Sequence, residues 1–111
     1  KKNYEGVREA YEKAIQLDPE SSHVLNNLAW LYATCEDEYY RNPERALELA
    51  KQAAQLERAP HIFDTLAESY FVNGMYEQAI RTGKQALKLA KRNRSYYRAQ
   101  LEKFEKAYES R

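Results

Sequence analysis

A pattern of regularly spaced apolar residues occurs twice in this chain, and it constrains the fold more than any other feature. Residues 25–32 have the form Leu-x-x-Leu-Ala-x-x-Tyr, and residues 63–70, which begin 38 positions later, have the form Phe-x-x-Leu-Ala-x-x-Tyr. In an α-helix these spacings place all four side chains on one face. A pattern that recurs at such a period predicts a stack of similar helical units.

The second of these units also shows how its helices are joined. Asn73-Gly74 follows the first helical pattern and is a typical helix end. A further apolar stripe begins at Tyr76. Two amphipathic helices joined by so short a turn pack antiparallel. The motif at the end of this second helix, an alanine, an apolar residue, any residue and a leucine, occurs three times, at Ala14, Ala53 and Ala86.

These residues resemble the tetratricopeptide repeat family, whose period is about 34 residues. The resemblance covers nearly the whole chain. The family's large-x-x-Leu-small-x-x-Tyr pattern matches residues 25–32 and 63–70, and Asp18-Pro19 is similar to its terminating Asp-Pro. The small residues of the family's second helix are matched by alanines at five positions: Ala14, Ala46, Ala53, Ala79 and Ala86.

The resemblance implies an all-α fold, an α-solenoid of antiparallel helix pairs with about six helices. We expect one domain over residues 1–111. Its parts are the second helix of a truncated repeat at 1–19, a repeat at 20–58 with an enlarged inter-helix loop at 35–43, a repeat at 59–92, and a capping helix at 93–111. In the later repeats Ala50 and Gly83 stand where the family has an aromatic residue, so we expect looser packing there.

Local signals place the helix starts. Ser21 and Ser22 are good N-cap residues for a helix ending near Thr34. Asn42-Pro43 provides an N-cap and a first-turn proline for the next helix. The composition agrees with an all-helical chain, because only three Gly and three Pro are available to break it. No apolar run is long enough to span a membrane, and the single cysteine, Cys35, excludes an internal disulfide.

The usual signatures of catalysis are missing from the sequence. It contains no nucleophile elbow, zinc-protease motif, phosphate loop or Cys/His cluster, so we expect no enzyme and no cofactor. His23 and His61 occupy equivalent repeat positions, but a metal site would need a third ligand that neither has nearby in the sequence. We therefore expect no metal.

The function that the resemblance implies is a non-catalytic protein–protein interaction scaffold, in which the inner helices line a concave groove for a peptide or partner segment. The residues that would face this groove are His23, Asn26, Asn27, Trp30, Thr34, His61, Asp64, Thr65, Glu68 and Phe71. One branch of the family clamps a carboxylate with cations, but Asp64 and Glu68 are acidic. We therefore expect the segment to be basic and apolar.

The orientation of Trp30 is open at this point. The spacing of Asn26, Trp30 and Ala33 places them on one stripe, which favours the groove. Alternatively, Trp30 packs under the loop that contains Tyr39-Tyr40.

Two alternative functions arise from the ends of the chain. Residues 81–111 carry ten Lys/Arg and three Asp/Glu, and the run 91–98 interleaves basic with aromatic residues, as single-strand nucleic-acid binders do. We do not favour nucleic acid, because this charge is confined to one end. The first helix, with Tyr4, Val7 and Tyr11 on its apolar face, lacks its family partner, so it could form a homo-oligomer through that face.

Overall fold

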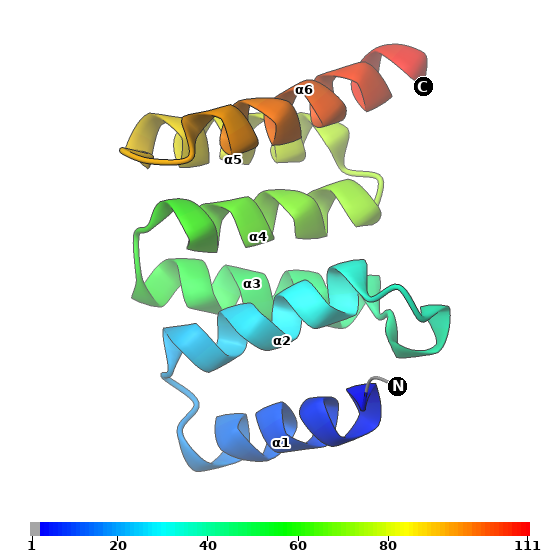
Figure 1. The fold of residues 1–111 in the computed structure, drawn as a ribbon, viewed down its shortest axis with the longest axis vertical. Helices are drawn as coiled ribbons and strands as arrows, with labels where there is room; N and C mark the ends of the chain where they lie inside the picture. The colour runs from blue at the N-terminus through cyan, green and yellow to red at the C-terminus, as the bar shows by residue number, and fades with distance from the viewer. Residues whose placement is uncertain (1–2) are drawn as a thin grey trace.

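A computed structural model describes residues 3–111, which form an all-helical stack with no β-strand among them. The helices are α1 (Tyr4–Leu17), α2 (Ser22–Thr34), α3 (Pro43–Leu56), α4 (Pro60–Val72), α5 (Tyr76–Leu89) and α6 (Arg94–Ser110), with a short 3₁₀ helix η1 (Glu38–Tyr40) between α2 and α3. Figure 1 shows them stacked in chain order along the longest axis, with the N-terminus at one end and the C-terminus at the other. The expected solenoid of antiparallel helix pairs is confirmed.

Helices α2 and α3 start where their capping residues predict. The side-chain oxygen of Ser21 accepts a hydrogen bond from the backbone N–H of Val24, at 3.3 Å, and Asn42 does the same for Arg45, at 3.2 Å. Pro43 occupies the first turn of α3, where its missing N–H costs nothing. Gly74 has a φ of 75°, a left-handed conformation that suits glycine and turns the chain from α4 into α5.

The repeated alanines lie at the contacts between helices. Ala46, Ala53 and Ala79 are fully buried, and Ala86 is nearly so. Ala46 and Ala53 pack with the large buried side chains of α2 to α4, including Leu25, Leu28, Leu49 and Ile62. Ala79 belongs to a second cluster, with Ala67 and Phe104. Helix α1 is different, because none of its residues is buried. Val7 is 42% exposed and Leu17 is 78% exposed. Self-association through α1 stays a prediction.

The enlarged loop between α2 and α3 packs on α1. The ring of Tyr40 lies 5.8 Å from that of Tyr4, centroid to centroid, and the guanidinium of Arg8 lies over Tyr40 at 5.5 Å. The Tyr4 hydroxyl donates a hydrogen bond to Glu36. The inserted residues therefore hold α1 against the rest of the stack.

Helix α6 covers α5 and closes the C-terminal side of the core. Phe104 is fully buried and packs with Ala67 and Ala79. A Cβ added to Gly83 would stand 3.3 Å from the Phe104 ring, and Ala50 is itself fully buried. The expectation of looser packing is therefore wrong at Gly83, because the ring of Phe104 occupies the space beside it. At Ala50 it stays a prediction. Within residues 3–111, no helix is both long enough and apolar enough to cross a membrane.

Candidate functional site

The inner faces of α2 and α4 border a cavity of about 720 Å³. Helix α1 contributes Tyr4, Val7 and Tyr11 to its lining, and α6 contributes Tyr96 and Tyr97. We call this cavity the groove. Among the residues expected at a partner-binding surface, it is lined by Asn26, Asn27, Trp30, Thr34, His61, Asp64 and Thr65. The three that do not line it are His23, Glu68 and Phe71.

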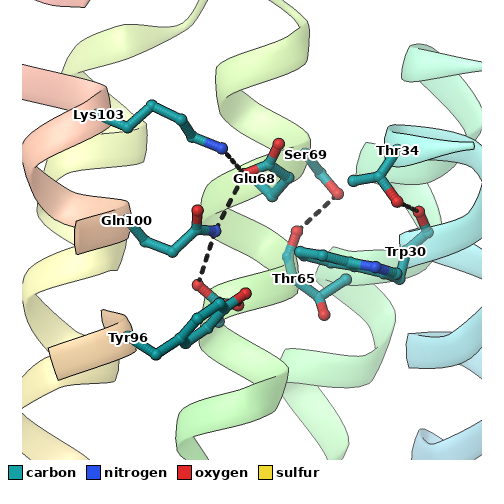
Figure 2. Close-up of polar contacts among 9 residues, drawn as sticks. Trp30, Thr34, Thr65, Glu68, Ser69, Tyr96, Gln100 and Lys103 are labelled. Atoms are coloured by element: carbon teal, nitrogen blue, oxygen red, sulfur yellow. Dashed lines mark hydrogen bonds and ion pairs between the residues drawn. The ribbon is translucent and has the colours of Figure 1, made fainter. Parts of the chain in front are cut away.

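Trp30 lies in the groove and is partly exposed. Figure 2 shows its indole reaching from α2 toward Thr65 on α4. Tyr39 is 76% exposed and packs edge-on against Tyr40, which in turn contacts Tyr4. The loop thus engages α1, and the structure places the Trp30 ring in the groove.

The hydroxyl groups beside Trp30 are held by the backbone of their own helices. Thr34 Oγ1 donates to the Trp30 carbonyl at 2.7 Å, and Thr65 Oγ1 donates to the His61 carbonyl at 3.1 Å. Ser69 Oγ donates to the Thr65 carbonyl in the same way, at 2.7 Å. These bonds satisfy the hydroxyl donors, so the surface around the indole is preorganised without any ligand.

Two acidic side chains of α4 are bound by polar side chains of α6 (Figure 2). Tyr96 Oη donates to Asp64 Oδ2 at 2.9 Å. Gln100 Nε2 bridges Asp64 Oδ1 at 3.2 Å and Glu68 Oε1 at 3.1 Å. Lys103 Nζ forms an ion pair with Glu68 Oε1 at 2.8 Å. This network ties the start and middle of α6 to the inner helix α4.

The hydrogen bonds of this network do not fully offset the cost of burying the Asp64 charge. Burial raises the pKa of this carboxyl group, and the negative charge of Glu68 raises it further. The hydrogen bonds from Tyr96 and Gln100 lower the pKa of Asp64, but the net direction is upward. Burial and the neighbouring Asp64 charge also raise the pKa of the Tyr96 hydroxyl, so Tyr96 remains a proton donor at neutral pH.

Three of the expected groove residues have other surroundings. His23 is exposed and its Nε2 lies 3.2 Å from Asn27 Nδ2. Glu68 is bound to α6, as described above. The Phe71 ring lies 5.3 Å from the ring of Phe104, with Lys103 Nζ 4.9 Å above it. Glu68 and Phe71 thus contact the capping helix α6 and do not line the groove.

The tyrosines that line the groove from α1 and α6 were not among the expected site residues. A signal for Tyr97 is present in the sequence, because Tyr97 and Phe104 stand 34 positions after Phe63 and Tyr70. This spacing indicates that α6 takes the place of a further inner helix. For the α1 tyrosines, Tyr4 and Tyr11, the sequence predicts only an uncovered apolar face.

Asn26 is the one groove residue whose polar group is buried without a partner. The side chain is 8% exposed, and its Oδ1 makes no hydrogen bond within the described residues. Most buried side-chain polar atoms in folded proteins are paired, so this exception needs an explanation.

The basic run at 91–98 has structural contacts in this fold. Arg94 Nη1 donates to the carbonyl oxygens of Leu87 and Ala90, both at 2.7 Å, and so binds the C-terminal end of α5. A cation at this position is favoured by the helix dipole. Within residues 3–111, no three His, Cys, Asp or Glu side chains are grouped so that they could hold a metal ion.

Comparison with known families adds an independent observation. Residues 10–59 match the family model described as Tetratricopeptide repeat. This part of the chain belongs to the tetratricopeptide repeat family. The matched tetratricopeptide repeat segment contains α2 and α3 with most of α1, and α4 and α5 repeat the same antiparallel hairpin. No curated protein matches the chain significantly. Tetratricopeptide repeats generally mediate protein–protein interactions and are typically not catalytic.

Proposed function

We propose that this chain is a non-catalytic interaction module that binds an extended or helical segment of a partner protein in the groove. The observation that carries the proposal is the partly exposed indole of Trp30 inside a cavity of about 720 Å³. Binding sites of this size usually combine an apolar lining with a few fixed polar groups. Buried aromatic anchors contribute much of the energy at protein interfaces, and tryptophan is prominent among them.

The surroundings of Trp30 support this assignment. Tyr11 and Leu31 add apolar surface to the groove, and Asn27 adds a polar side chain. The neighbouring hydroxyl groups are already oriented by backbone hydrogen bonds, so the wall loses little further conformational freedom on binding. Such a surface suits a segment that places an apolar side chain against the indole and directs polar groups along the wall.

The test uses a phage library of random short peptides panned against the domain, with enriched peptides then synthesised. Trp30 is the only tryptophan, so its fluorescence reports on the groove alone. We expect enriched peptides to shield Trp30 from acrylamide, and Trp30→Ala to weaken their binding by about 2 kcal/mol or more. The matched control is Tyr39→Ala, which removes an exposed aromatic ring outside the groove and is expected to leave binding unchanged.

Two results would contradict the proposal. One is a panning experiment that enriches no peptide above background. The other is a set of enriched peptides that bind without changing Trp30 quenching and bind Trp30→Ala as well as the parent chain, since they would be using another face.

A further inference from the structure

The buried amide of Asn26 is costly to the free protein. Its Oδ1 is shielded from solvent and unpaired, although the residue lines the groove. Leaving a buried acceptor unsatisfied destabilises a fold, because the group gives up its hydrogen bonds to water and gains none in return. An apolar side chain of similar size would avoid this cost. The contacts of the amide therefore show no stabilising role for it. Hydrogen bonding to a ligand would explain why an asparagine stands at this position.

The missing partner of Asn26 is a hydrogen-bond donor. Oδ1 is a carbonyl oxygen and can only accept. The last side-chain torsion of asparagine is soft, so the amide can turn its oxygen toward a molecule in the groove. The donor must come from outside, because no described group of the protein supplies it.

The opposite wall of the groove carries excess negative charge. Asp64 lines the groove, and Glu68, one helical turn further along α4, is a second buried carboxylate that does not itself line it. Lys103 is the one cation that forms an ion pair with Glu68 among the described residues. Each oxygen of Asp64 accepts one hydrogen bond from α6, and a carboxylate oxygen can accept two. The residues that line the groove include no Lys or Arg within the described part of the chain. A cation entering the groove would be attracted by Asp64, and no described Lys or Arg side chain on the groove lining would oppose it.

The indole of Trp30 reaches across the space between these two walls. In Figure 2 it extends from α2 toward α4, the helix that also holds Asp64. The face of an indole ring attracts ammonium and guanidinium groups, and Trp is the best aromatic residue for this contact. Three features thus lie around one cavity. They are the unpaired acceptor of Asn26, the Asp64 carboxylate, which can accept further hydrogen bonds, and the aromatic face of Trp30.

We propose that the groove holds a basic side chain, the ammonium of a lysine or the guanidinium of an arginine, on the partner segment, with Asn26 and Asp64 as its acceptors and Trp30 as its aromatic platform. This inference rests on the proposed function. Asn26 then stabilises the complex rather than the fold. An acidic segment is disfavoured, because it would face Asp64 and leave Asn26 unpaired.

The first experiment uses the peptides enriched from the random library. We expect most of them to contain Arg or Lys next to an apolar residue. Each is then resynthesised with arginine replaced by citrulline, which keeps the shape and removes the charge, or with lysine replaced by norleucine. The expected loss of affinity is about tenfold or more, as for other charged hydrogen bonds. Exchanging arginine for lysine in the same peptides distinguishes the two basic groups.

The second experiment separates binding from folding. Asn26→Leu removes the unpaired amide. We expect this variant to keep or raise the denaturation midpoint, and to bind the basic peptides with about tenfold lower affinity. Asn27→Leu is the matched control on the same helix. Its amide also lines the groove, but it already contacts His23 and is not one of the two proposed acceptors, so we expect a smaller loss of affinity.

The outcomes distinguish this inference from the proposed function. Peptides that shield Trp30 but show no preference for basic residues would overturn the inference and leave the interaction module standing. A clearly lowered midpoint for Asn26→Leu, with unchanged peptide affinity, would also overturn it, because the amide would then have a structural partner such as a bound water. Failure to enrich any peptide would remove the proposed function itself.

Discussion

The ring of Phe104 in α6 lies directly against Gly83 in α5. A Cβ added to the glycine would stand 3.3 Å from two carbons of that ring, closer than most real Cβ contacts. Phe104 is fully buried, so the two positions form one packing unit between different helices. Helix α6 therefore docks into space that a side chain on α5 would fill.

This contact predicts a compensating pair of substitutions. Gly83→Leu should overpack the interface and destabilise the protein by about 1–3 kcal/mol. Phe104→Ala should cost about 3–5 kcal/mol by leaving a cavity. In the double variant the leucine enters that cavity, so the combined loss measured by urea denaturation should be smaller than the sum of the two. Strictly additive losses would show that the two side chains do not share this space.

Lys103 is expected to anchor α6 to α4. Its ammonium pairs with Glu68, whose side chain is 8% exposed. Lys103→Met leaves that carboxylate with one hydrogen bond, from Gln100, and should destabilise the protein by about 1–3 kcal/mol. Lys106 is exposed on the same helix, so Lys106→Met serves as the control and should change stability by less than about 0.5 kcal/mol. Equal denaturation midpoints for the two variants would exclude this anchoring role.

Glu12 should make stability depend on pH. Burial by itself raises the pKa of this carboxyl group. Hydrogen bonds from Tyr32 at 2.6 Å and Arg45 at 3.0 Å lower the pKa, and the net pKa lies below the ordinary 4.5. Burial and the contact with Glu12 raise the pKa of Tyr32 to about 12. Because the folded-state pKa of Glu12 is lowered, its stabilisation is present above pH 4.5 and is lost as the pH falls through the folded value.

The measurement compares the unfolding free energy of the parent chain with that of Glu12→Gln across this range. At neutral pH the parent should be more stable by roughly 1 kcal/mol, a small value because the ion pair is partly exposed. The difference should shrink below pH 4.5. Glu9→Gln, an exposed neighbour on the same helix, should show no such trend. A difference that stays constant with pH would mean that the Glu12 charge is not involved.

The inserted loop should stabilise α1 without shielding Trp30. Tyr40→Ala removes the ring that contacts Tyr4 and Arg8, so amide hydrogen exchange in α1 should become faster. Acrylamide quenching of Trp30 should remain as in the parent chain. A large increase in quenching would instead place the indole under the loop.

Much of the fold could be predicted because its signals are local. Ser21, Asn42-Pro43 and Gly74 act on the turn in which they stand, so the helix boundaries follow from neighbouring residues. Helical spacing places Asn26 and Trp30 on one stripe and Asp64 on the matching stripe of α4, and these three residues line the same cavity. Glu68 and Phe71, from the stripe of Asp64, do not line it.

The helical solenoid was thus determined by the sequence alone, because periodicity decides which face of each helix is apolar and short turns decide which helices pair. Which partner each polar side chain binds depended on the tertiary structure. Gln100 and Lys103 bind Asp64 and Glu68 only because α6 docks beside α4, more than 30 positions away in the chain. The same docking brings Tyr96 and Tyr97 into the groove. The unpaired state of Asn26 emerges only when every neighbour is in place, since a missing hydrogen bond is a property of the packed structure and not of spacing.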